Sequence, residues 1–489
     1  MHTHKFRLSC SMQSVVPATV LLILAPPVTW AQQTNSDEVR ELRNMVVLLQ
    51  QRVDKLEAQS ANNAVPGAAV QLKASNAQPD LSPLAGQASA DLQTPAGAAP
   101  SGQTDHEAIA APRNTLPDTT VNVSLDGYYD YNFNHPVGRV NALRAYDVLS
   151  NNFSLSQASV VMERAPDLTA GRRFGARVDL QFGQATDTLA GNPANEPRPQ
   201  IYRNIFQAYG TYVAPIGKGL TLDFGKWSSS LGIEGNYTKD QMNYSRSYYF
   251  DFLPFYHMGA RANYKFNDQF AANYWIVNGA DQAEATNGFK DEMFGFVVTP
   301  HRSVTWTFNY YLGQENPDRI AVSTLGPVPL QPGLTFVKIS PAPDGRLHIF
   351  DSYVNWVVTP KLALAVEGDY VVQRTWRHAA PGHSSAPKRD DGGAAYARYQ
   401  LTPKLALAGR AEYLMDHGGA FSNINQALKE TTTTFDYQLA DGFLMRYEWR
   451  RDFSNMPTFF TDAQGVLTRQ QTTATVGLVW WWGQKQGSW

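Results

Sequence analysis

The stretch VTPKLALAVEGDY, residues 358–370, decides the fold, and it recurs with few changes as LTPKLALAGRAEY at residues 401–413. After each Thr-Pro pair, apolar side chains such as Leu362 and Leu364 alternate with small or polar ones. A period of two residues is typical of a β-strand whose two faces meet different surroundings. A third version, VTPHRSVTWTFNY, begins at Val298. Because proline fixes φ and lacks an amide donor, we expect each Thr-Pro to end one strand at a tight turn.

Similar alternating segments continue from residue 119 to the end of the chain. We predict sixteen strands, near residues 120–133, 152–163, 173–183, 202–213, 219–226, 255–266, 269–278, 292–299, 303–313, 347–358, 361–374, 394–401, 404–415, 432–439, 442–451 and 472–482. Long and short connections alternate between these strands, as they do in antiparallel barrels that cross a membrane. A soluble Greek-key fold has no reason to keep this alternation. The sequence therefore predicts an all-β transmembrane fold, a 16-stranded antiparallel outer-membrane β-barrel over residues 119–489.

The physical reason for a barrel is that lipid offers no hydrogen-bond partners to the backbone. Strands can cross the bilayer only when they close into a cylinder that leaves no free edge. The apolar face of each strand then meets lipid, and the polar face lines a lumen.

The first 31 residues have the order of a secretory signal peptide. Lys5 and Arg7 precede the short apolar run VVPATVLLILA at residues 15–25, and we predict cleavage after residue 31. The alternative, an N-terminal membrane anchor, is weaker because the run falls short of about twenty residues. The single cysteine, Cys10, lies inside this segment, so the mature chain is expected to contain no thiol.

Residues 32–57 carry a heptad pattern, and residues 58–118 resemble a tether. The heptad positions hold Val39, Leu42, Val46, Leu49, Val53 and Leu56. This spacing predicts a short coiled-coil helix, although an amphipathic helix lying on another surface would show the same pattern. The following segment is rich in Ala and Pro, and no aromatic residue occurs between residues 31 and 118. Because it can bury little apolar surface, we expect a disordered, flexible linker.

Composition and motifs exclude several classes of function. The formal net charge is −2 and no basic cluster is present, so no nucleic-acid partner is expected. Neither GxSxG, HExxH nor a phosphate-binding loop occurs in the predicted barrel. We therefore predict no enzyme activity, no catalytic residues, no cofactor and no metal site.

The segment FGKWSSSLGIEGNYTKDQMNYSRSYYFDFLPFYHMGARANYKF, residues 224–266, resembles the OmpL-like family of bacterial β-barrel porins. The residues that carry this resemblance are Gly232, Glu234, Ser245, Pro254, His257, Gly259, Arg261 and Tyr264. Such barrels usually close their last strand on an aromatic residue. Here the strand-ending Trp482 is followed by seven further residues, so either Trp482 or Trp489 can fill this role.

The resemblance also implies that the third long connection, residues 227–254, folds into the barrel and narrows it. This connection contains many aromatic residues together with Glu234, Asp240 and Asp251, which a solvated loop would not need. Strand parity directs five arginines toward the lumen: Arg177, Arg261, Arg398, Arg410 and Arg446. Rings of charged side chains set selectivity in pores. The alternative is that each arginine only pairs with a lumenal carboxylate, as Arg410 would with Glu412.

Together these patterns predict a water-filled outer-membrane channel for passive diffusion of small hydrophilic solutes or ions. Two alternatives are a selective channel for phosphate or organic anions and an envelope tether that uses the barrel as its anchor. Expected partners are outer-membrane lipid and lipopolysaccharide, the barrel-insertion machinery, and the cell wall through residues 32–57 in the periplasm. The resemblance implies a homotrimer, although Val at position a with Leu at position d favours two-stranded coiled coils.

Overall fold

The structure is a computed structural model. It describes residues 118–190, 196, 198–317, 320–321, 336–337, 343–379, 382–485 and 488–489. The predicted signal peptide (1–31), coiled coil (32–57) and linker (58–118, apart from its last residue) lie outside the described residues and stay predictions. Within the described part of the chain, no helix is both long enough and apolar enough to cross a bilayer.

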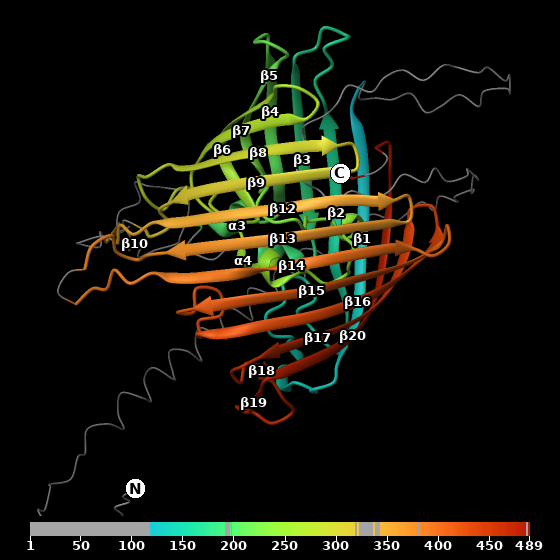
Figure 1. Ribbon diagram of the computed structural model, residues 1–489, viewed down its shortest axis with the longest axis vertical. Coiled ribbons are helices and arrows are strands. Elements are labelled where there is room, and N and C mark those ends of the chain that lie inside the picture. Colours follow the sequence, from blue (N-terminus) through green and yellow to red (C-terminus); the bar gives the residue numbers. More distant parts are fainter. Residues whose placement is uncertain are drawn as a thin grey trace, which may run out of the picture. The chain divides into compact units, whose positions relative to one another are not determined.

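Sixteen strands of the described residues form one closed antiparallel barrel in chain order, which confirms the predicted fold class (Figure 1). The strands are β1 (Thr120–Asn132), β2 (Asn152–Arg164), β3 (Phe174–Phe182), β4 (Ile205–Ala214), β5 (Leu220–Ser228), β6 (Tyr256–Lys265), β7 (Phe270–Val277), β8 (Asp291–His301), β9 (Val304–Gly313), β12 (Leu347–Thr359), β13 (Leu362–Gln373), β14 (Lys388–Gln400), β15 (Leu405–His417), β16 (Gln426–Ala440), β17 (Phe443–Ser454) and β20 (Gln470–Gly483).

The remaining elements lie in the connections between these strands. Two small two-stranded sheets pair β10 (Ile320–Ala321) with β11 (Phe336–Val337) and β18 (Phe459–Phe460) with β19 (Leu467–Thr468). The short helices are η1 (Val137–Arg139), α2 (Ala185–Leu189), α3 (Pro199–Tyr202), η2 (Thr238–Asp240) and α4 (Tyr248–Phe252). The sequence pattern predicted none of these.

The barrel closes where the first strand pairs with the last. β1 and β20 pair in an unbroken antiparallel register that runs from Asn122 opposite Gly483 to Asn132 opposite Thr473. No strand of the ring therefore keeps a free edge, as a lipid environment requires.

Burial along the strands is inverted relative to a soluble protein. In β1, the polar side chains of Asn122 and Asp126 are buried, whereas Val121 and Leu125 are exposed. The extreme case is Phe153 on β2, whose exposed fraction is 87%. The apolar faces thus form the outer surface and the polar faces the lumen, as the alternation predicted.

Two strands begin six residues earlier than the sequence pattern indicated. β14 begins at Lys388 rather than residue 394, and β16 begins at Gln426 rather than residue 432. The added part of β14 has the sequence KRDDGG, in which no apolar residue alternates with a polar one. Its ladder continues in register, with Asp390 opposite Asp416. Backbone pairing therefore extends beyond the band of the barrel whose outer face is apolar. In that outer region, the alternation of apolar and polar residues no longer marks a strand.

The Thr-Pro turns are closed by the threonine side chain. Thr359 Oγ1 accepts hydrogen bonds from the amides of Lys361 and Leu362, at 3.2 and 3.0 Å. The turn after β14 is closed in the same way. At the third turn the expectation was wrong, because Pro300 lies within β8, where the register shifts between Val298 and His301. An irregularity of this kind tolerates proline because it removes a ladder hydrogen bond.

Candidate functional site

The connection between β5 and β6, residues 229–255 and here called the inward loop, lies inside the barrel. The Tyr237 hydroxyl donates to Asp179 Oδ2 on β3 at 2.6 Å. Asn243 Nδ2 donates to Thr434 Oγ1 on β16 at 2.7 Å. β3 and β16 lie far apart around the ring, so only a chain that crosses the lumen can bond to both. Figure 1 shows α4, part of this loop, behind β13 and β14.

Two carboxylates of the wall each hold two consecutive amides of the inward loop. The amides of Tyr244 and Ser245 donate to the two oxygens of Glu448, on β17, at 2.6 and 2.9 Å. The amides of Tyr248 and Tyr249 donate to the two oxygens of Glu412, on β15, at 2.9 and 3.0 Å. Hydrogen bonds to charged acceptors are stronger than neutral ones. These two glutamates therefore fix the height and orientation of the loop against the wall.

The aromatic residues of the loop pack against the inner wall. Tyr248 and Tyr249 are fully buried in α4 and belong to a cluster with Trp227 at the end of β5. Helix α4 begins at a standard cap, in which Ser247 Oγ accepts a hydrogen bond from the amide of Phe250 at 3.0 Å. The apolar core of the molecule thus lies in the lumen, between the loop and the wall.

Arg410 links the wall to the inward loop. Its guanidinium pairs with Glu430 on β16 at 2.5 Å and with Glu234 of the loop at 2.7 Å. It also donates to the carbonyl oxygen of Ser245 at 2.8 Å. The pairing considered with Glu412 is absent between these two described residues, because the Glu412 carboxylate faces the amides of α4 instead.

Arg177 and Arg261 also face inward, and each pairs with a carboxylate of the wall. Arg177 Nε lies 2.9 Å from Asp179 Oδ1, two residues along the same strand. Arg261 Nε lies 2.8 Å from Asp223 Oδ2 on the neighbouring β5. The Arg261 guanidinium is also surrounded by three aromatic rings, those of Tyr209, Trp227 and Trp275.

The last two predicted arginines share one carboxylate. Arg446 Nε lies 3.1 Å from Asp436, and its other nitrogens donate to loop carbonyls, including those of Thr238 and Asn243. Arg398 pairs with the same Asp436. The side chain of Arg446 is fully buried, whereas 13% of the Arg398 side chain is exposed. Of these two arginines, only Arg398 keeps a face toward open space.

The three acidic residues predicted in the loop have different surroundings. Glu234 accepts a hydrogen bond from the amide of Ser247 in addition to pairing with Arg410. Asp240 pairs with the adjacent Lys239 at 2.7 Å. Burial within the barrel raises the pKa of Asp251 to about 6, against the opposing charge of Arg450. Glu234 and Asp240 line the cavity described next, whereas Asp251 does not.

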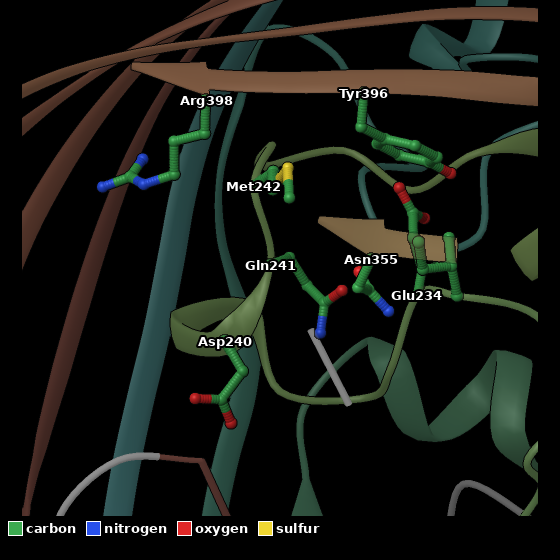
Figure 2. Close-up of a pocket in the computed structure, with 8 residues that line it drawn as sticks. Glu234, Asp240, Gln241, Met242, Asn355, Tyr396 and Arg398 are labelled. Atoms are coloured by element: carbon green, nitrogen blue, oxygen red, sulfur yellow. The ribbon is translucent and has the colours of Figure 1, made fainter. Parts of the chain in front are cut away.

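A small cavity lies between the inward loop and β12–β14 (Figure 2). It is lined by Ile233, Glu234, Asp240, Gln241, Met242, Asn355, Tyr396 and Arg398. Two acidic side chains of the loop and one arginine of the wall thus border the same space. Charges of both signs therefore border this cavity.

Sequence reasoning missed several residues of this site. Glu412 and Glu448 alternate with apolar residues like any lumenal position, so nothing marked them as acceptors for the loop. Of the two candidates for the closing aromatic, Trp482 lies on the exposed outer face of β20. Trp489 is buried, with its ring 5.7 Å from that of Tyr237 and with Lys239 Nζ 4.5 Å from the ring centre. The end of the chain therefore contacts the inward loop.

We predict that replacing both glutamate anchors by glutamine (E412Q with E448Q) releases the loop. A glutamate accepts hydrogen bonds from two amides, one on each carboxylate oxygen. A glutamine replaces one of these oxygens by an NH₂ group, which cannot accept, so at least one of the two hydrogen bonds is lost. Each hydrogen bond to a charged group contributes about 1.5–3 kcal/mol and at least two are lost, so trypsin should cut after Lys239 or Arg246 roughly a hundredfold or more faster in the variant. Both of these residues are buried in the native structure.

The matched control is E292Q, which alters a carboxylate exposed on the outer face of β8. Its cleavage rate should equal that of the unaltered protein. Equal rates for the double variant and the control would contradict the role of the two anchors.

The chain is similar to several solved structures and to one protein family. One similar solved structure is OmpT, an outer membrane protein of Vibrio cholerae, with 11% sequence identity and a TM-score of 0.44 over 74% of this chain and 97% of that chain. A second is the outer membrane channel DcaP of Acinetobacter baumannii, with 10% identity and a TM-score of 0.46 over 74% of this chain and 97% of that chain. A third is an anion-selective porin from Comamonas acidovorans, with 8% identity and a TM-score of 0.44 over 74% of this chain and 99% of that chain. No curated protein matches the chain. Residues 118–480 match the family described as "Putative beta-barrel porin-2, OmpL-like". The chain therefore belongs to this porin family and is a β-barrel channel protein of the outer membrane.

Proposed function

We propose that the protein lets small hydrophilic solutes and ions diffuse passively through the space between the inward loop and β12–β14. The observation that carries this proposal is the small cavity bordered by Glu234, Asp240 and Arg398. The inward loop crosses the lumen, and we propose the gap between this loop and β12–β14 as the route. Its small size favours ions and small solutes over larger ones.

We propose weak selectivity for this route. The five inward arginines each pair with a carboxylate, so their charges largely cancel locally. A selective anion channel would need arginines without such partners. Arg398, whose side chain is partly exposed at the cavity, is the group best placed to act on a passing ion. This arrangement supports the general channel over the phosphate or organic-anion alternative.

Planar-bilayer recording of the folded, heat-modifiable protein tests the function. We expect stepwise conductance that rises with salt concentration and needs no energy source. Arg398→Gln should shift the reversal potential in a salt gradient toward cation preference, because Glu234 and Asp240 then border the cavity without that arginine.

Arg398→Lys serves as the matched control, since it keeps the positive charge and should keep the reversal potential near that of the unaltered protein. Absence of conductance steps from folded protein would contradict the channel proposal. Identical reversal potentials for the glutamine and lysine variants would contradict the role of Arg398 in ion preference but not the channel proposal itself.

For the assembly, we propose a homotrimer with residues 32–57 in the periplasm. Outer-membrane lipid and lipopolysaccharide would surround the barrels, the insertion machinery would fold them, and the arm would reach the cell wall. The heptad supports association, and the tether function rests on this arm alone. Deleting residues 32–118 should therefore leave conductance intact.

Mass measurement in detergent, with and without residues 32–57, checks the oligomer. We expect a trimer in both forms, because contacts between barrels should dominate over a helix of about three heptads. A monomer in both forms would contradict the oligomer. A dimer that is lost on deletion would show that the helix determines the assembly.

A further inference from the structure

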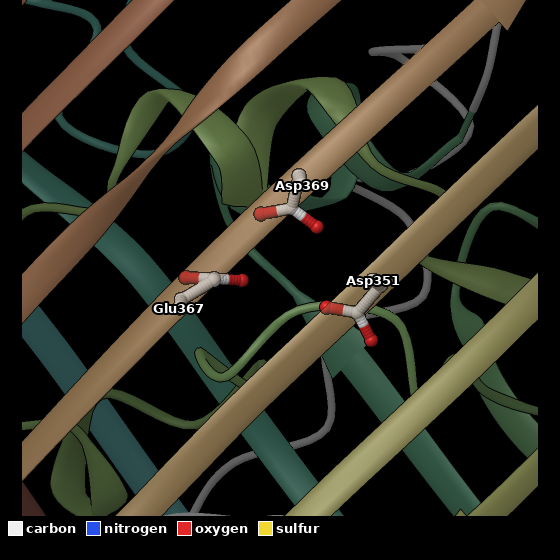
Figure 3. A group of neighbouring side chains, drawn as sticks. All are labelled: Asp351, Glu367 and Asp369. Atoms are coloured by element: carbon white, nitrogen blue, oxygen red, sulfur yellow. The ribbon is translucent and has the colours of Figure 1, made fainter.

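Three carboxylates meet on the inner wall outside the cavity described above. Asp351 on β12 lies directly opposite Asp369 on β13 in the strand register, and Glu367 precedes Asp369 by two residues on the same face. One oxygen of each carboxylate lies within 4.8 Å of the others. Figure 3 shows the three side chains gathered between these two strands. We call this group the carboxylate triad.

Several lumenal carboxylates pair with an arginine, whereas no member of the triad has a cationic partner among the described residues. The carboxylates of Asp179, Asp223 and Asp436 each pair with an arginine. No lysine, arginine or histidine of the described residues forms an ion pair with any triad member, although all three are buried. Burying ionised carboxylates so close together is costly unless an opposite charge joins them.

Only some of the carboxylate oxygens of the triad accept a hydrogen bond. Asn309 Nδ2 donates to one oxygen of Asp351 at 2.7 Å, and the amide of Ile233 donates to Glu367 at 3.0 Å. The Tyr396 hydroxyl reaches the second oxygen of Glu367 at 3.4 Å. Both oxygens of Asp369 and the second oxygen of Asp351 have no hydrogen-bond partner, and Asp369 is only 5% exposed.

The inward loop places a neutral hydroxyl oxygen, that of Tyr249, beside the carboxylate triad. Tyr249 of α4 is fully buried, and its hydroxyl has no hydrogen-bond partner. A methyl group built on Gly392 would lie 2.8 Å from that hydroxyl oxygen. Gly392 on β14 is the residue directly opposite Asp369. The inward loop therefore brings an unpaired hydroxyl beside the carboxylate whose oxygens are both unpaired.

We propose that the carboxylate triad binds a calcium ion, with the Tyr249 hydroxyl as a further oxygen ligand. Ca²⁺ takes six to eight oxygen ligands at about 2.3–2.6 Å in flexible geometry, and three carboxylate oxygens within 4.8 Å of one another can all reach one such ion. Mg²⁺ demands a near-regular octahedron at about 2.0–2.1 Å and usually keeps several waters, so a buried site with three protein carboxylates fits it less well. The ion would offset the buried negative charge and fasten α4 to β12 and β13. This inference does not depend on conduction.

Calcium binding is measured on the mature chain refolded in a non-ionic detergent free of lipopolysaccharide. After chelator treatment, calorimetric titration with CaCl₂ at neutral pH should show one Ca²⁺ per chain. Asp351→Asn combined with Asp369→Asn should weaken this binding by about tenfold or more, because it removes two of the charged ligands. The control Asp223→Asn alters a lumenal carboxylate that pairs with Arg261 and should keep the site.

Heat-modifiable gel migration establishes that each variant is folded. If the double variant does not fold, Tyr249→Phe provides the second test, since it removes only the hydroxyl and should weaken Ca²⁺ binding while the carboxylates remain. No Ca²⁺ binding by the unaltered protein would overturn the proposal and indicate that the triad is neutralised by protons. Unchanged affinity in the folded double variant would overturn it as well.

Discussion

The lack of hydrogen-bond partners in lipid is the constraint on which this structure depends. It forces the strands to close, so that β1 pairs with β20 along eleven residues and no edge is left free. Closure places apolar side chains such as Phe153 outside and polar ones such as Asp126 inside. Every later feature of the protein, including the charged lumen and the loop that crosses it, follows from this separation of the two faces.

A polar lumen can hold a long loop only if the loop's own backbone groups find partners there. The wall provides them as carboxylates, with Glu412 and Glu448 each accepting two consecutive amides. Arginines of the wall complete the arrangement by donating to loop carbonyls, as Arg446 does. The same residues that make the lumen polar therefore also bind the loop that crosses it.

The strands could be predicted from the sequence because alternation of apolar and polar residues survives wherever one face meets lipid. The prediction failed at the start of β14, where residues 388–393 extend past that region and both faces lack apolar side chains. The inward arginines followed from strand parity. The partners of these arginines could not be predicted in this way. The contact between Arg410 and Glu234, for example, joins residues 176 positions apart and depends on how the loop folds. The triad was missed for the same reason, since only pairing of β12 with β13 brings Asp351 to Asp369.

Hydrogen–deuterium exchange of the folded protein tests the central claim, that the inward loop is bonded to the wall, most directly. The amides of Ile233, Tyr244, Ser245, Tyr248 and Tyr249 all donate to wall carboxylates. Peptides covering residues 231–253 should therefore exchange as slowly as the strands β15–β17, and far more slowly than the exposed residues 462–467. Exchange of residues 231–253 as fast as that of residues 462–467 would contradict this account.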